Sequence, residues 1–130
     1  MSQQEIYLGN PNLKRANVAQ NFTPKEVEEF VKCSKDPVYF ITNYIKIISL
    51  DLGLVPFELY PFQADMVNKF HDNRFNIAKL PRQSGKSTVV TAYLLWYSIF
   101  NDNVNVAILA NKAATAREML QRLQLSYENL

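Results

Sequence analysis

The chain has 130 residues, of which 48% are hydrophobic and 12% aromatic, and this composition suffices for one hydrophobic core. Its 14 basic and 12 acidic residues give a formal net charge of +2, which is too small to indicate nucleic acid as a partner. Cys33 is the only cysteine, which excludes an intrachain disulfide and a cysteine-rich metal site. No secretory signal is visible, and the apolar run 89–100 is too short for a bilayer, so we expect a soluble intracellular protein.

The first part of the chain is predicted to be an extended arm followed by two helices. Residues 1–21 are polar and contain a turn signal, which indicates an extended arm. Thr23 and Glu26 have the spacing of a capping box, which predicts a helix to about Ser34. Asp36, which is followed by a proline, predicts the start of a second helix.

A hairpin is predicted after these helices. Residues 46–50 and 54–57 are apolar segments around a short turn, in which Gly53 is expected to adopt a positive φ. Pro56 has no backbone N–H and therefore restricts the second segment to the edge of a sheet. We predict that residues 22–58 form one helical segment with a hairpin.

The next pattern is a short apolar strand, a polar turn and a long apolar helix. Residues 74–80 alternate apolar side chains as a strand does, and residues 89–100 are apolar on nearly every side, as in a buried crossover helix. Between them lies Gly-Lys-Ser at 85–87, the end of the phosphate-binding consensus, although Leu80 replaces its first glycine. This context favours a phosphate-binding loop over an ordinary polar turn.

The residue types in this turn suit a polyphosphate and its magnesium ion. Gly85 lets backbone N–H groups approach a phosphate, and the N-terminus of the following helix attracts negative charge. Lys86 can reach the β and γ phosphates, and the hydroxyl of Ser87 can ligate Mg²⁺. The predicted phosphate-binding residues are Pro81, Arg82, Gln83, Ser84, Gly85, Lys86, Ser87 and Thr88.

Gln63 lies upstream of this turn, at the start of a helix predicted over residues 62–70. Its side chain offers a donor and an acceptor together, as the N6 and N7 edge of adenine requires, and an aromatic neighbour can stack on the base. Taken alone, Gln63 is better explained as an ordinary polar residue on the first turn of a helix.

The last part of the chain completes the expected fold. Residues 104–110 are predicted to be a second strand and residues 115–127 an amphipathic helix. We therefore expect an α/β fold, the start of a helicase-like P-loop NTPase with flanking helices. Its two strands are predicted to lie parallel in one sheet, joined by a right-handed crossover. Residues 59–130 would be an incomplete P-loop ATPase domain.

Several segments resemble those of known motor ATPases. Residues 59–63, followed by a strand and Gly-Lys-Ser, resemble the adenine-reading motif and phosphate loop of helicase-like proteins. Residues 81–88, with an arginine after the strand and no first glycine, resemble the deviant Walker A of viral large terminase subunits. Residues 9–17, 38–40 and 108–112 are similar to segments of the large terminase of T-even-type tailed bacteriophages and their cyanophage relatives. The resemblance covers nearly the whole chain.

The resemblance implies a role for individual residues. Arg82 would stabilise charge on the γ-phosphoryl group in cis, and Lys86 with Ser87 would hold the phosphates and Mg²⁺, so that Arg82 and Lys86 are the expected catalytic residues. Gln63 would read adenine, which makes ATP and Mg²⁺ the expected cofactors. Glu58 departs from the relatives, which have a second glutamine there, because a carboxylate accepts a hydrogen bond but cannot donate one.

The same resemblance implies the function of a larger assembly. The chain would be the N-terminal part of an ATPase motor that packages double-stranded DNA into a procapsid. Its partners would be a portal protein and a small terminase subunit, in a homo-oligomeric ring in the host cytoplasm, with no membrane. The Walker B acidic pair and the nuclease domain of that ATPase are absent here, so the chain alone is expected to be inactive. The alternatives are a helicase-like DNA translocase and a nucleotide-binding module without activity of its own.

Overall fold

The computed structural model describes residues 6–8, 10–17, 19, 21–49 and 51–130. These residues belong to two compact units, one within residues 1–30 and one within residues 31–130. Among the described residues, no helix combines the length and the apolar composition that a membrane crossing requires.

The amino-terminal unit contains two short antiparallel strands, β1 (Ile6–Tyr7) and β2 (Asn10–Lys14), and the start of helix α1 (Pro24–Lys35). The arm predicted over residues 1–21 thus includes a paired segment, and residues 1–5, 9, 18 and 20 lie outside the described residues. The predicted capping box is confirmed. The N–H of Thr23 donates to Oε2 of Glu26 at 2.7 Å, and the N–H of Glu26 donates to Oγ1 of Thr23 at 3.3 Å.

The second unit is mainly helical, and its helices begin and end close to the predicted residues. Asp36 accepts a hydrogen bond from the N–H of Tyr39 at 3.0 Å, which caps the first of these helices as predicted. The helices are α2 (Pro37–Tyr44), α3 (Pro61–Asp72), α4 (Lys86–Phe100) and α5 (Ala113–Glu128).

Helix α4 is the centre of the core, because α2, α3 and α5 all pack against it. It contributes buried side chains from successive turns, as its apolar sequence predicts. Trp96 is buried, and its Nε1 donates to the backbone oxygen of Cys33 at 2.8 Å. The buried apolar residues are Cys33, Phe40, Ile41, Ile45, Phe57, Met66, Val67, Val89, Ala92, Leu95 and Trp96.

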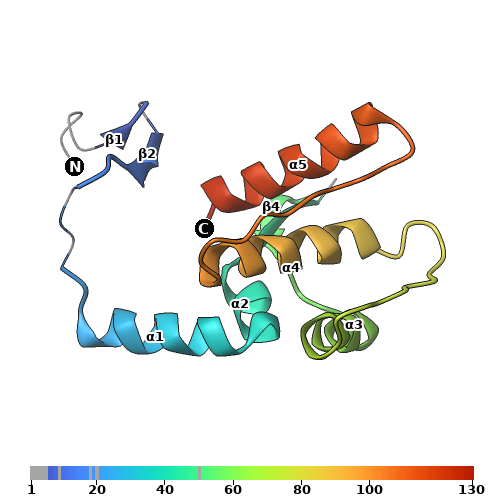
Figure 1. The fold of residues 1–130 in the computed structure, drawn as a ribbon, viewed down its shortest axis with the longest axis horizontal. Helices are drawn as coiled ribbons and strands as arrows, with labels where there is room; N and C mark the ends of the chain where they lie inside the picture. Colours follow the sequence, from blue (N-terminus) through green and yellow to red (C-terminus); the bar gives the residue numbers. More distant parts are fainter. Residues whose placement is uncertain (1–5, 9, 18, 20, 50) are drawn as a thin grey trace. The chain divides into compact units, whose positions relative to one another are not determined.

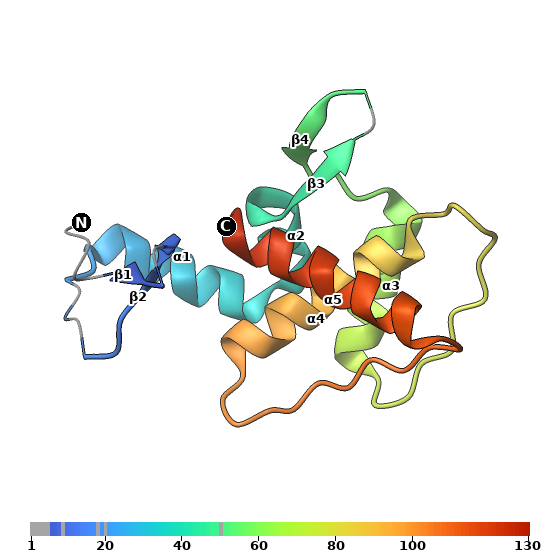
Figure 2. The same cartoon turned by 90° about the horizontal axis from the view of Figure 1, so that it is seen from above.

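The predicted hairpin is confirmed as the antiparallel pair β3 (Lys46–Ser49) and β4 (Gly53–Pro56). Gly53 has a φ of 71°, the left-handed conformation that the turn requires of it. The base of the hairpin is tied to the core, because the N–H of Phe57 donates to the backbone oxygen of Ile45 at 2.9 Å and both side chains are buried. The rest of the hairpin stands out from the helices (Figure 2).

The predicted parallel sheet is wrong. The structure is mostly helical, and the strands it assigns among the described residues form two separate two-stranded antiparallel pairs. Residues 74–80 and 104–110 are extended but have no ladder of strand hydrogen bonds. The side chains that suggested strands face solvent, since Ile77 is fully exposed and Leu109 is 88% exposed. A strand requires a hydrogen-bonded neighbour, and neither segment has one in the described part of the chain.

Residues 101–112 nevertheless return the chain along α4, so that α4 and α5 lie side by side and run in roughly the same direction (Figures 1 and 2). Helix α5 has no buried residues, and Leu123 is its contact with the core. The turn before α4 is accessible, since residues 81–83 and 85 are exposed.

Candidate functional site

The turn before α4 has a backbone that only a few residue types adopt. Gln83 has a φ of 59° and Gly85 a φ of 75°, so both lie in the left-handed region. Gly85 is also the residue that caps α4, and the N–H of Val89 donates to its backbone oxygen at 3.0 Å. The hydroxyl of Ser84 donates to the backbone oxygen of Pro81 at 3.0 Å, which closes the turn on itself.

The N-terminus of α4 lacks the side-chain cap that α2 has. Gly85 has no side chain, and the first turn of α4 carries no acidic residue. The first N–H groups of a helix have no acceptor within the helix, and together they carry about half a positive charge. This end of α4, with Lys86 beside it, is therefore suited to an anion that brings its own acceptors.

Gln63 connects the start of α3 to this turn. Its side chain is buried, with an exposed fraction of 3%, and its Oε1 accepts from the N–H of Tyr60 at 3.0 Å. Its Nε2 donates to the backbone oxygen of Ser84 at 3.2 Å, 21 residues further along the chain. A primary amide has one more N–H and one more lone pair than these two bonds use.

Lys86, Arg82 and Ser87 were predicted to contact the phosphates or Mg²⁺, and each has different surroundings in the structure. Nζ of Lys86 donates to the backbone oxygen of Leu80 at 3.3 Å, so the amine is folded back across the turn. Arg82 is exposed and has no carboxylate partner among the described residues. Ser87 is half-buried, and its hydroxyl has no hydrogen-bond partner in the described part of the chain, which leaves it available as a metal ligand.

A cavity of about 760 Å³ joins the turn to the start of α3 and to the hairpin. It is open to solvent rather than enclosed, so a ligand bound there would stay partly exposed. Of the predicted site residues, Arg82, Lys86 and Ser87 do not line it. The cavity is lined by Ile47, Leu52, Val55, Pro56, Phe57, Glu58, Tyr60, Phe62, Gln63, Pro81, Gln83, Ser84, Gly85 and Thr88.

Two groups of residues that line this cavity were not predicted to belong to the site. The rings of Tyr60 and Phe62 are stacked, with centroids 6.0 Å apart and planes at 7°, and both rings are largely exposed. The hairpin contributes apolar side chains from a segment upstream of Gln63. The aromatic pair could have been found from its position beside Gln63, whereas the hairpin has no chemical motif and is placed by folding alone.

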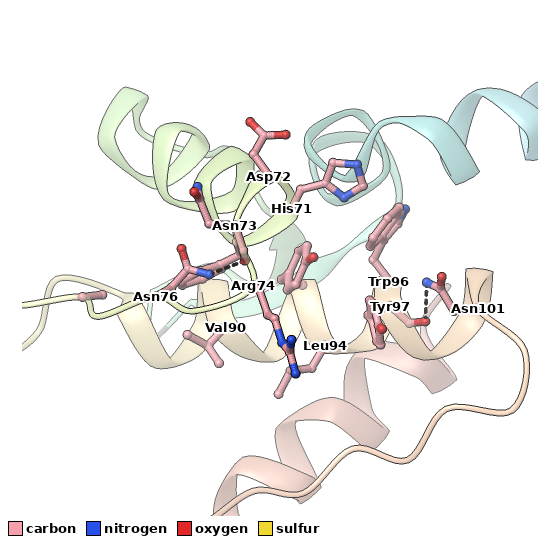
Figure 3. A pocket seen from close by; sticks show the side chains of 13 residues that line it. His71, Asp72, Asn73, Arg74, Asn76, Val90, Leu94, Trp96, Tyr97 and Asn101 are labelled. Carbon is pink, nitrogen blue, oxygen red and sulfur yellow. Dashed lines mark hydrogen bonds between the residues drawn. The ribbon is translucent and has the colours of Figure 1, made fainter.

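A second pocket, of about 730 Å³, lies between the end of α3, residues 73–78 and α4 (Figure 3). It contains none of the predicted site residues. Arg74 extends toward Leu94 across it, and the amide of Asn76 is bonded to the backbone oxygen of Asn73 at 2.9 Å. Burial raises the pKa of Tyr93 in this pocket, with further contributions from Tyr97 and Asp72, so its phenol stays neutral at physiological pH.

The turn, the uncapped end of α4 and the aromatic cavity together suit a ligand that has both an anionic group and a planar ring. No known protein-family model matches the sequence.

Replacement of Gly85 by alanine tests how tightly the turn and Gln63 are joined. A Cβ at Gly85 would lie 2.7 Å from Nε2 of Gln63, and the φ of 75° adds the strain of a left-handed residue, about 1–2 kcal/mol. We expect Gly85→Ala to lower the free energy of unfolding, measured by chemical denaturation, by more than that strain alone.

Gly53→Ala is the matched control. Gly53 has a similar φ of 71°, but no described atom beyond its chain neighbours lies within 4 Å of the place that a Cβ would take, so this variant reports the backbone strain by itself. The excess loss in Gly85→Ala should shrink when Gln63 is also replaced by alanine. Equal losses for the two glycine variants would contradict the close contact between Gly85 and Gln63.

Proposed function

We propose that this chain binds ATP with Mg²⁺ through the turn at the start of α4. The observation that supports this most strongly is the single cavity that joins the turn, Gln63 and an exposed aromatic pair. A nucleotide needs both halves of such a site, because its phosphates require N–H donors and a cation while its base requires a flat apolar surface.

Each half of the ligand has candidate partners. The N–H groups at the start of α4 and the amine of Lys86 suit the phosphates, once the amine leaves the backbone oxygen of Leu80. The hydroxyl of Ser87 suits Mg²⁺, which neutralises phosphate charge when bound. The remaining donor and acceptor of Gln63 suit the edge of adenine, and the ring of Tyr60 or Phe62 suits its face.

We propose further that the chain belongs to the ATPase motor of a viral large terminase, which packages double-stranded DNA into a procapsid. The support for this finer proposal is the sequence resemblance, above all the arginine at position 82 within the turn. In that function Arg82 would stabilise the charge that develops on the γ-phosphoryl group. Portal protein, small terminase subunit and a ring of copies in the host cytoplasm are part of the same proposal.

A nucleotide-binding module without activity is the second candidate. Glu58 is the only carboxylate that lines the cavity in the described part of the chain. Hydrolysis of ATP requires acidic groups to hold the metal and to orient the attacking water. Binding without hydrolysis by the isolated chain would therefore agree with both candidates.

The base preference of binding tests the proposed role of Gln63. We expect the chain to bind ATP about tenfold more tightly than GTP, because guanine has the acceptor O6 where adenine has the donor N6, which leaves the oxygen of Gln63 facing another acceptor. Gln63→Ala should bring the two affinities together. Gln63→Ala also removes the bond to Ser84, which disturbs the turn and weakens the binding of both nucleotides. The ratio of the two affinities is therefore more informative than either affinity alone. Equal binding of ATP and GTP by the unmutated chain would contradict base reading by Gln63.

A further inference from the structure

We infer that the β3–β4 hairpin is part of the nucleotide site and that its side chains Leu52 and Val55 contact the purine base. This inference rests on the proposed nucleotide binding and adds a specificity element that lies outside the turn and α3. It follows from three features of the hairpin: which face lines the cavity, how exposed its apolar side chains are, and how its base is anchored.

The two faces of the hairpin are distinct. Ile47 pairs with Val55 and Ile48 with Leu54, and successive residues of a strand point to opposite faces. Ile47 and Val55 line the cavity that contains Gln63, whereas Ile48 and Leu54 do not. The hairpin therefore presents one of its two faces to the proposed nucleotide site.

The turn of the hairpin carries an apolar side chain that has no cover. Leu52 is 78% exposed, yet it lines the same cavity as Tyr60 and Phe62. An exposed leucine is ordinary by itself, but here aliphatic and aromatic surfaces share one cavity with a phosphate-binding turn. A planar heterocycle attached to phosphates can contact all of them at once and remove their apolar area from water.

The base of the hairpin is fixed while its far end projects. Ile45 and Phe57 are buried on either side of it and joined by a backbone hydrogen bond. Beyond this point the hairpin stands away from the helices (Figure 2). The anchor thus holds the base of the hairpin against the core, close in the chain to Gln63, which follows Phe57 by six residues.

The experiment compares ATP with inorganic tripolyphosphate, each with Mg²⁺, by calorimetric titration of the purified chain. Leu52→Ala should weaken ATP binding about fivefold to tenfold, because part of the apolar contact with the base is lost. Binding of tripolyphosphate should stay within about twofold, since that ligand has no base. Leu52→Met, which keeps the side-chain volume, should restore most of the affinity for ATP.

Leu54→Ala is the matched control, because it removes the same type of side chain from the same hairpin at a residue that does not line the cavity. It should leave both affinities within about twofold of the unmutated chain. Unchanged ATP binding in Leu52→Ala, or an equal loss in Leu54→Ala, would overturn the inference and leave nucleotide binding intact. Failure of the unmutated chain to bind either ligand would instead refute the proposed function, and the hairpin's role with it.

Discussion

In an ATPase that contains this segment, Arg82→Ala is expected to lower turnover about 10³-fold or more while leaving nucleotide affinity nearly unchanged. Arg82 lies in the turn, three residues before Gly85, and a guanidinium can meet two phosphate oxygens at once. The alternative role for this arginine is a structural ion pair with a carboxylate. No such pair is present among the described residues, where Arg82 is exposed.

Single-turnover ATP hydrolysis, measured beside equilibrium binding, separates the two roles of Arg82. Arg74→Ala is a suitable control, because Arg74 is also exposed but lines the second pocket instead. Turnover of Arg82→Ala within about tenfold of the unmutated enzyme corresponds to only ~1.4 kcal/mol of barrier and would reject the catalytic assignment.

Lys86→Ala is expected to weaken binding of ATP and of tripolyphosphate alike, by about tenfold to a hundredfold. Lys86 is the first residue of α4, and the hydrogen bond of its amine to the backbone oxygen of Leu80 is one that a phosphate can replace. Stability should change little, because the amine bonds a single backbone oxygen that is only partly buried.

Calorimetric titration with both ligands measures this loss, with Lys79→Ala as the control for a change in net charge. Lys79 is exposed and precedes the turn, and it lines neither the cavity beside Gln63 nor the second pocket. If Lys79→Ala weakened binding as much as Lys86→Ala, general electrostatic attraction would explain the effect and the specific role of Lys86 would fail.

Local features of the fold were predictable because short-range interactions determine them. The hydrogen bonds between Thr23 and Glu26, the cap at Asp36 and the positive φ of Gly53 all follow from residues within four positions of each other. The long helix that starts at Lys86 was also predictable, because residues 89–100 are apolar on nearly every side, as in a buried helix.

The sheet was mispredicted because strand pairing is not a local property. Alternation at Phe75 and Ile77 is compatible with a strand, but it does not supply a neighbour to bond with. Both side chains are largely or fully exposed, so the alternation marks no buried face. A strand that is predicted only from alternating apolar side chains therefore needs independent evidence of a segment that can pair with it.

The part of the candidate site that is formed by neighbouring residues was predictable, and the part that depends on contacts between distant residues was not. Gly85, Lys86 and Ser87 are adjacent and form a recognisable chemical pattern, whereas the bond from Gln63 to Ser84 joins residues 21 positions apart. The contribution of Leu52 depends on where the hairpin folds, and no motif in the sequence indicates that position.

The most direct test of nucleotide binding at the turn before α4 is a calorimetric titration of the purified chain with ATP and Mg²⁺. Saturable binding of one nucleotide per chain, weakened about tenfold or more in Lys86→Ala and in Gly85→Ala, is the predicted result. The absence of saturable binding at millimolar ATP, in a chain whose helical content is intact by circular dichroism, would contradict it.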